Sequence, residues 1–228
     1  MIKNILLAAL LAVGFSTPVI AGSVKTDMLD PVVKINDNCS AEGVNTPEGP
    51  RLLTAAHCAT SKEGTFFQET RNDEGKIIKR TYYTFDVIRT DTMKDLGLLK
   101  VRDESYEIKT VNLAEKILVE EGDDVWTVGY PLAFTRVITE GLYNQPLIVD
   151  VNNDQKEDLR LRASPGLDGG NSGGVLFQKN GDKYEQIGVT SMKFRNNDFM
   201  GIYIPLKDIR EFLRMDVGKP LSYQIDQR

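Results

Sequence analysis

The sequence is poor in the residue types that bind metals and nucleic acids. Its 228 residues include one histidine and two cysteines, too few for a zinc site built from four His and Cys ligands. Lysine and arginine number 28 against 33 aspartates and glutamates, so the net charge of −5 does not predict a basic surface for nucleic acid. Apolar residues make up 41% and charged residues 27%, which excludes a disordered, collagen-like or multi-span membrane protein. We therefore expect a mildly acidic, soluble globular protein with no cofactor, no metal and no nucleic-acid partner.

The N-terminus also lacks a hydrophobic run long enough to cross a membrane. Its apolar stretch, residues 5–15, is too short to span about 30 Å of hydrocarbon. Lys3 precedes the stretch and small residues up to Ala21 follow it, which is typical of a secretory signal peptide; a buried N-terminal helix is the alternative. We expect cleavage after Ala21, a mature protein of residues 22–228 in a secreted or periplasmic location, and no membrane association afterwards.

The remaining chain is typical of an all-β protein, with short apolar segments between turn residues. An acidic stretch at 115–124 divides it into two halves, which we expect to be successive β-subdomains. Apolar residues recur at helical spacing only in residues 206–214, which predicts a short terminal helix. The expected strands are residues 31–35, 51–55, 65–68, 77–89, 96–101, 125–130, 134–142, 159–162, 174–178, 185–194 and 201–204.

Three short segments carry reactive side chains. The apolar segment 52–58 contains His57, the segment 95–101 begins with Asp95, and the glycine-rich segment 168–174 contains Ser172. Each alone has an ordinary structural interpretation: a surface histidine, a turn aspartate and a loop. Together they meet the requirements of nucleophilic catalysis.

A serine hydroxyl is a weak nucleophile until a neighbouring base takes its proton. His57 is the only side chain here whose ordinary pKa, about 6.5, suits that task near neutral pH. A carboxylate such as Asp95 would orient the imidazole and stabilise its charged form. Glycines on both sides of Ser172 would let backbone amides approach an oxyanion.

These segments resemble the chymotrypsin-like (trypsin-like) serine peptidases. The sequences TAAHC at 54–58 and GNSGG at 170–174 are similar to the two signature motifs of that family and follow its order of His, Asp and Ser. Further similarity covers residues 125–131, 188–192, 201–203 and 206–214. The resemblance implies two six-stranded antiparallel Greek-key β-barrels, at about 30–115 and 120–205, with a short C-terminal helix.

The resemblance also implies a role for each matching residue. Ser172 would be the nucleophile, His57 the general base and then acid, and Asp95 the orienting carboxylate, with Asp91 as a nearby rival. The amides of Gly170 and Ser172 would form the oxyanion hole. Residues 191–193 would supply the backbone edge on which a peptide substrate pairs as an added strand.

A disulfide between Cys39 and Cys58 is implied as well. Family members often bridge the corresponding strands, and an exported protein permits such a bond. It would clamp the segment that carries His57.

Two departures from the animal digestive enzymes indicate a bacterial type. Asn171 stands where those enzymes hold the aspartate that receives a new N-terminus, and residues 22–24 lack the usual activation sequence. The chain is more similar to the protease domain of the HtrA group and to the glutamyl endopeptidases. Because few residues follow Tyr203, we expect a peptidase domain alone, without a PDZ domain, and a monomer.

Substrate preference is less clear from the sequence. Gly166 occupies the position where trypsin-like enzymes hold an aspartate, which disfavours strict cleavage after Arg or Lys. Asp168 remains close enough to reach the pocket, and Lys193 could attract an acidic residue. The expected substrate-binding residues are Gly166, Leu167, Asp168, Thr190, Ser191, Met192 and Lys193.

Two alternatives stay open. Residues 150–158 have acidic residues at calcium-loop spacing, but Gln155 and Leu161 replace the turn glycine and closing glutamate, so a solvated hairpin tip is favoured. The function we expect is a serine endopeptidase acting on proteins or peptides through an acyl-enzyme. The alternative is an inactive homologue of the same fold that serves as a binding or adhesion module.

Overall fold

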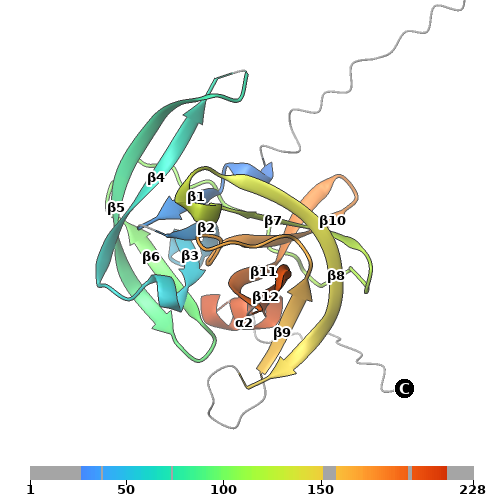
Figure 1. The fold of residues 1–228 in the computed structure, drawn as a ribbon. Coiled ribbons are helices and arrows are strands. Elements are labelled where there is room, and N and C mark those ends of the chain that lie inside the picture. The colour runs from blue at the N-terminus through green and yellow to red at the C-terminus, as the bar shows by residue number, and fades with distance from the viewer. Residues whose placement is uncertain (1–26, 37, 73, 151–157, 195–196, 215–228) are drawn as a thin grey trace, which may run out of the picture.

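The protein folds into two closed antiparallel barrels of six strands each, which lie side by side (Figure 1). This computed structural model describes residues 27–214 except residues 37, 73, 151–157 and 195–196. Hydrogen-bonded neighbours run β1-β2-β3-β6-β5-β4 in the first barrel and β7-β8-β9-β12-β11-β10 in the second, so both barrels share one topology. The prediction of two six-stranded antiparallel barrels followed by a short helix is confirmed.

The first barrel consists of β1 (Val32–Ile35), β2 (Cys39–Thr46), β3 (Gly49–Ala55), β4 (Glu63–Arg71), β5 (Ile77–Asp91) and β6 (Leu96–Val101), with the 3-10 helix η1 (Ala56–Cys58) after β3. The second consists of β7 (Asp124–Gly129), β8 (Val137–Val149), β9 (Asp158–Ala163), β10 (Val175–Asn180), β11 (Lys183–Phe194) and β12 (Asn197–Pro205), with the 3-10 helix η2 (Pro131–Ala133) after β7. Helix α2 (Leu206–Leu213) follows the last strand.

Strand β2 is absent from the segments expected from the sequence. Its residues include Ser40, Glu42 and Gly43, which lack the β-branched and aromatic side chains that favour strands. The strand forms because β1 and β3 pair with it on both sides and bury it. A Cβ on Gly43 would lie 1.9 Å from the carbonyl oxygen of Lys109, so the close approach of that segment requires glycine.

Strand β8 begins and ends later than expected. The segment before it forms η2, in which Leu132 and Ala133 have positive φ values of 53° and 60°. Such a backbone cannot continue a β ladder, so pairing with β7 starts only at Val137. β8 then extends to Val149 and pairs with β9.

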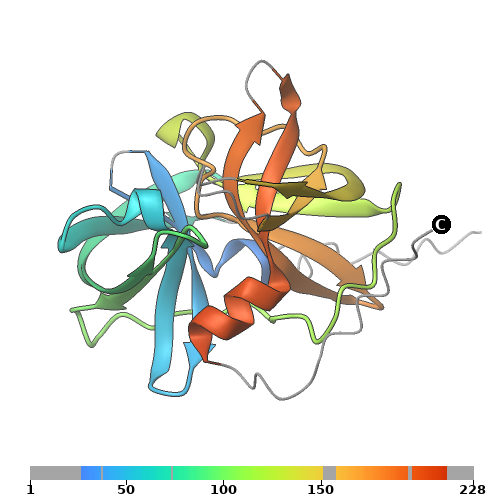
Figure 2. The ribbon, with the colours of Figure 1, turned by 90° about the horizontal axis from the view of Figure 1, so that it is seen from below.

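Apolar side chains form three buried clusters. One fills the first barrel around Ile35, Leu52 and Phe85, and one fills the second around Leu161 and Tyr203. The third cluster lies between the barrels and includes residues of both, together with the apolar face of α2. Figure 2 shows α2 between the two barrels on the lower side of the molecule. The interface between the barrels is therefore a hydrophobic core in its own right.

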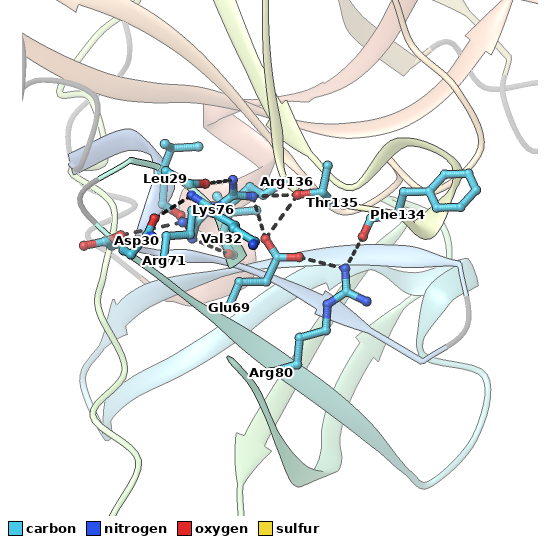
Figure 3. A network of polar contacts seen from close by, with 12 residues as sticks. Leu29, Asp30, Val32, Glu69, Arg71, Lys76, Arg80, Phe134, Thr135 and Arg136 are labelled. Carbon is cyan, nitrogen blue, oxygen red and sulfur yellow. Dashed lines mark hydrogen bonds and ion pairs between the residues drawn. The ribbon is translucent and has the colours of Figure 1, made fainter. Parts of the chain in front are cut away.

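A polar network also joins the barrels (Figure 3). The fully buried carboxylate of Glu69 on β4 lies 2.7 Å from Arg71 Nη2 and 3.1 Å from Arg80 Nη2. Both arginines continue to the second barrel, where Arg71 donates to Thr135 Oγ1 at 2.6 Å and Arg80 to the carbonyl oxygen of Phe134 at 2.6 Å. A buried carboxylate needs such partners to offset its lost hydration. Since the two arginines that pair with Glu69 also bond Thr135 and Phe134, the network holds the segment after η2 against the first barrel.

Two expectations concern residues that the structure does not describe. The expected signal peptide, residues 1–21, lies outside the described residues, and so do Asn152 and Asp154 of the calcium-like pattern. Among the residues that are described, we find no helix whose length and apolar character would let it cross a membrane.

The expected disulfide is present between Cys39, at the start of β2, and Cys58, at the end of η1. It joins residues 19 apart in the sequence. In the loop-entropy model, such a bond lowers the conformational entropy of the unfolded chain and so stabilises the folded protein by about 3 kcal/mol.

The double variant Cys39→Ala/Cys58→Ala should therefore lose about 3 kcal/mol in its free energy of unfolding, measured in urea. A reductant should lower the stability of the wild type to that of the variant and leave the variant unchanged. Equal stability of the two oxidised proteins would contradict this expectation.

Candidate active site

The three candidate catalytic residues line one cavity of about 580 Å³ between the barrels. His57 and Asp95 come from the first barrel and Ser172 from the second. All but one of the expected substrate-binding residues also line this cavity: Leu167, Asp168, Thr190, Ser191, Met192 and Lys193. The exception is Gly166, and Gly170, expected in the oxyanion hole, is not among the lining residues either. Three further lining residues, Thr92, Gly169 and Asn171, were not expected to contribute.

His57 projects from η1, and Asp95 holds it at three points. The imidazole Nδ1 lies 3.0 Å from both carboxylate oxygens of Asp95. The backbone N–H of His57 also donates to Asp95 Oδ1 at 3.1 Å. This arrangement restrains both the ring and the backbone that carries it.

Asp95 occupies the turn before β6 and is largely buried. Its φ of 61° lies in the left-handed region, which aspartate tolerates better than most residues. The Ser191 hydroxyl donates to its Oδ2 at 2.6 Å. Burial raises the pKa of Asp95, but the hydrogen bonds from His57 and Ser191 and the charge of His57 outweigh burial and hold that pKa below its usual value. Asp95 is therefore an ionised hydrogen-bond acceptor.

The charge of Asp95 determines the state of His57. A carboxylate can only accept, so we assign the proton of neutral His57 to Nδ1, which leaves the lone pair on Nε2. The hydrogen bond to Asp95 raises the pKa of His57, burial partly opposes that rise, and the negative charge of Asp95 adds to it. His57 is thus a stronger base than a free imidazole.

The rival carboxylate, Asp91, serves a different purpose. Its Oδ1 accepts hydrogen bonds from the backbone N–H groups of Met93 and Lys94, at 3.1 and 3.0 Å. These bonds form a tight turn at the end of β5. Asp95, and not Asp91, is the carboxylate paired with His57.

Ser172 lies on the loop before β10, where its hydroxyl donates to the carbonyl oxygen of Ser191 at 3.2 Å. Within the described part of the chain, the backbone N–H groups of Asn171, Gly173 and Gly174 donate to carbonyl oxygens, whereas those of Gly170 and Ser172 have no protein acceptor. The two donors expected to stabilise an oxyanion are therefore not engaged by the protein.

Buried Ser40 on β2 anchors this loop to the first barrel. Its hydroxyl donates to the carbonyl oxygen of Gly170 at 2.7 Å and accepts from the N–H of Tyr130 at 2.9 Å. Its own N–H donates to the carbonyl oxygen of Ser172 at 2.8 Å, and its carbonyl accepts from Thr54 Oγ1 at 2.7 Å. One residue thus binds the carbonyls of both Gly170 and Ser172. The sequence carries no local signal of this role, because Gly170 lies 130 residues from Ser40 and Ser172 lies farther still.

Gly170 and Gly173 are needed for the shape of the loop. Their φ values are 105° and 80°. A Cβ on Gly170 would lie 2.2 Å from the carbonyl oxygen of Tyr130, and one on Gly173 would lie 2.1 Å from Thr54 Oγ1. Other residues would clash at these positions as well as strain the backbone. The N–H of Leu132 adds a bond of 2.6 Å to the carbonyl oxygen of Gly169.

Beside the cavity, the end of β11 pairs with one of the described strands, β12. β10 pairs with β11 only as far as Val189, whereas Met192 and Lys193 pair with β12 on the opposite side. Residues 191–193 therefore run along the cavity with one edge facing away from β12. At the cavity rim, Lys193 Nζ lies 3.9 Å from Asp168 Oδ1, and both side chains are about half exposed.

One group of potential metal ligands lies beside the cavity. The ligand atoms of Cys39, His57 and Cys58 lie within 4.8 Å of one another, and they form the one such group found among the described residues. Both sulfurs belong to the disulfide and are not thiolates, which are the form of cysteine that binds metals. The donor set does not fit a metal ion in this state.

Comparisons with known proteins identify the family of this chain. The trypsin-like peptidase domain matches residues 41–183. A protein from Staphylococcus aureus described as "Serine protease HtrA-like" is 24% identical over 175 residues, which are 72% of this chain and 21% of that protein. The chain thus spans about a fifth of the length of the curated relatives it matches.

Solved structures show the same fold. The active form of the Rv3671c protease from M. tuberculosis has a TM-score of 0.66 at 19% identity, covering 94% of this chain and 93% of that one. The HtrA-type protease AlgW, solved with a tripeptide, has a TM-score of 0.64 at 19% identity over 83% of this chain and 61% of that one. The chain belongs to the trypsin-like peptidase domain family, a family of serine-type hydrolases.

Proposed function

We propose that the protein is an exported serine endopeptidase in which Ser172, His57 and Asp95 form the catalytic triad. The observation that carries the proposal is the pairing of His57 Nδ1 with an ionised, largely buried Asp95, because it directs the basic Nε2 away from the carboxylate.

The proposed reaction begins when the Ser172 hydroxyl turns from the Ser191 carbonyl toward His57 Nε2. Oγ attacks the carbonyl carbon of the scissile peptide while its proton passes to Nε2. The N–H groups of Gly170 and Ser172 would stabilise the oxyanion, with about 3 kcal/mol expected from one such donor. The imidazolium then protonates the leaving amine, and a water molecule, activated by the same base, hydrolyses the acyl-enzyme.

The substrate would bind as an extended peptide along residues 191–193. Backbone hydrogen bonds to that edge of β11 would align the scissile bond over Ser172. Residues 1–21 would direct export and be removed in the process, so N-terminal sequencing of the protein recovered outside the cytoplasm should begin at Gly22.

The test of this function is covalent labelling of the mature, oxidised protein with a fluorophosphonate probe. We expect one phosphonyl group per molecule, located on Ser172 by peptide mass spectrometry, because only an activated serine attacks such a probe at neutral pH. Protein heated to unfolding is the control and should not react. A folded protein that takes up no label would instead support the inactive binding module.

The pH dependence gives a second prediction. His57 must be neutral to accept the proton, and its pKa is raised above 6.5 by Asp95. The kcat/KM should therefore fall as the pH decreases through a value above 6.5, in proportion to the fraction of neutral imidazole. A series of initial rates between pH 5 and pH 9 would measure this limb. A rate that stays constant down to pH 5 would contradict the assignment of His57 as base.

A further inference from the structure

The segment η2 fixes the direction of one of the two N–H groups expected in the oxyanion hole. The N–H of Leu132 in η2 donates to the carbonyl oxygen of Gly169 at 2.6 Å. That carbonyl and the N–H of Gly170 belong to one planar trans peptide, so they point in opposite directions. The bond from Leu132 therefore directs the Gly170 N–H away from η2. If this peptide turned over, the N–H would no longer be available to an oxyanion.

The conformation of η2 needs support from its surroundings. Leu132 and Ala133 have φ values of 53° and 60°, a region that residues with a side chain rarely adopt and that persists only where neighbours impose it. No residue of η2 is buried, and Leu132 and the following Phe134 are 60% and 71% exposed. Since apolar burial does not hold this segment, hydrogen bonds to neighbouring elements must do so.

These hydrogen bonds come from a network centred on Glu69 in the first barrel (Figure 3). Arg71 and Arg80 donate to Thr135 Oγ1 and to the Phe134 carbonyl, each at 2.6 Å. The Thr135 hydroxyl in turn donates to Glu69 Oε2 at 3.2 Å. The side chain of Glu69 is 0% exposed, whereas the two arginine side chains are 30% and 38% exposed. One buried carboxylate thus restrains two long side chains that would otherwise sample several rotamers.

The chain just beyond this segment is anchored separately. Arg136 is 9% exposed and donates to the carbonyl oxygens of Leu29 and Val32, at 2.6 and 3.3 Å. These bonds do not involve Glu69. A change at Glu69 should therefore loosen η2 while β8 keeps its attachment to the first barrel.

We propose that Glu69 is a positioning residue for the oxyanion hole. Through Arg71 and Arg80 it holds η2 in the conformation in which Leu132 fixes the peptide before Gly170. Glu69 is not among the residues that line the cavity of Ser172, so it acts only through these intermediates. The inference rests on the proposed peptidase function and adds a residue that prepares the site from outside the cavity.

The variant Glu69→Gln tests the inference, because it keeps the shape of the side chain and removes the charge that both arginines share. An oxyanion donor stabilises the transition state more than the bound peptide, so kcat should fall by about 10- to 100-fold with little change in KM. A peptide aldehyde is added as an inhibitor: Ser172 Oγ adds to its carbonyl carbon, and the oxygen of the resulting hemiacetal lies in the oxyanion hole. Its inhibition constant should rise by the same factor as kcat falls. Since that constant does not depend on the fraction of protein that is folded, a purely structural role would not change it.

Two further variants serve as controls. Glu63→Gln lies on the same strand, but Glu63 is exposed and pairs with Arg102 of the first barrel, so kcat and the inhibition constant should stay at wild-type values. Thr135→Val removes the hydroxyl that joins Glu69 and Arg71 to the second barrel, and it should reproduce the effect of E69Q. Because both substitutions interrupt one network, the double variant should lose little more than the larger single loss.

Each outcome decides the inference. Wild-type kcat in E69Q overturns it, and so does a lower kcat with an unchanged inhibition constant. Equal losses in E63Q, or losses that multiply in the double variant, overturn it too. If E69Q does not fold, a wild-type inhibition constant in T135V overturns it. Wild-type protein that cleaves no member of a peptide library and takes no fluorophosphonate overturns the proposed function itself, whereas an active wild type with an unaffected E69Q overturns only the role of Glu69.

Discussion

Replacing Ser172 by alanine is expected to reduce kcat by about 10⁶-fold, and replacing His57 by alanine should have a similar effect. The two losses are similar because each residue acts only through the other: without the base the hydroxyl stays protonated, and without the hydroxyl the base has no nucleophile to activate. The double variant should therefore be no slower than either single variant. Rates are measured on one peptide at saturating concentration with each protein at the same folded concentration.

The controls for this pair use features of this chain. Ser105→Ala removes an exposed hydroxyl that donates to Asp103 Oδ1, and it should keep full activity. Since His57 is the only histidine in the sequence, no other imidazole can replace it in His57→Ala. The proposed triad would be contradicted by a double variant whose fold-loss in kcat equals the product of the two single losses. Substantial activity in either single variant would contradict it too.

Asp95→Asn is expected to lower kcat by about 10⁴-fold while the protein remains folded. The carboxamide can turn its NH₂ group toward Nδ1, which favours the imidazole tautomer with the proton on Nε2. That tautomer cannot accept the proton of Ser172. The variant also loses the interaction that raises the pKa of His57, so the acid limb of its residual activity should move to lower pH than in the wild type. A pH series on both proteins measures the two effects together.

Asp91→Asn is the matched control for this substitution. An asparagine at position 91 retains a side-chain oxygen for the turn that bonds Met93 and Lys94, so activity should change little. Equal losses in D91N and D95N would indicate a general effect of charge on this surface. An acid limb that stays in place in D95N would indicate that Asp95 does not control the protonation of His57.

The sequence predicts those parts of the site that depend on reactive side chains within short segments. His57, Asp95 and Ser172 stand out because few residue types can perform the required chemistry and each has a distinctive neighbourhood. Ser191 is expected only as part of the substrate edge, yet its hydroxyl bonds Asp95 and its carbonyl bonds Ser172. A serine hydroxyl in a strand gives no sign of its partner until the two barrels are placed together.

The fold, like the site, is only partly predictable from local sequence. The apolar strands β3 and β6 are evident from their residues, whereas β2 is specified by what surrounds it. Ser40 and Glu42 are fully buried on β2 although both are polar, because their partners come from the second barrel: Gly170 for Ser40 and Gln186 for Glu42. Burial raises the pKa of Glu42 well above its usual value, with the bond from Gln186 acting against that rise. Polar residues whose partners are remote in sequence cannot be recognised as core residues from local pattern.

The attachment of Ser40 to the loop that carries Ser172 has a consequence for when the proposed activity can begin. The carbonyls of Gly170 and Ser172, which belong to the second barrel, are bound by a residue that is synthesised much earlier with the first. The contacts that hold the loop of Ser172 come from both barrels, so we expect the proposed activity to begin only once the two barrels have docked. A chain that is still unfolded would therefore lack that activity.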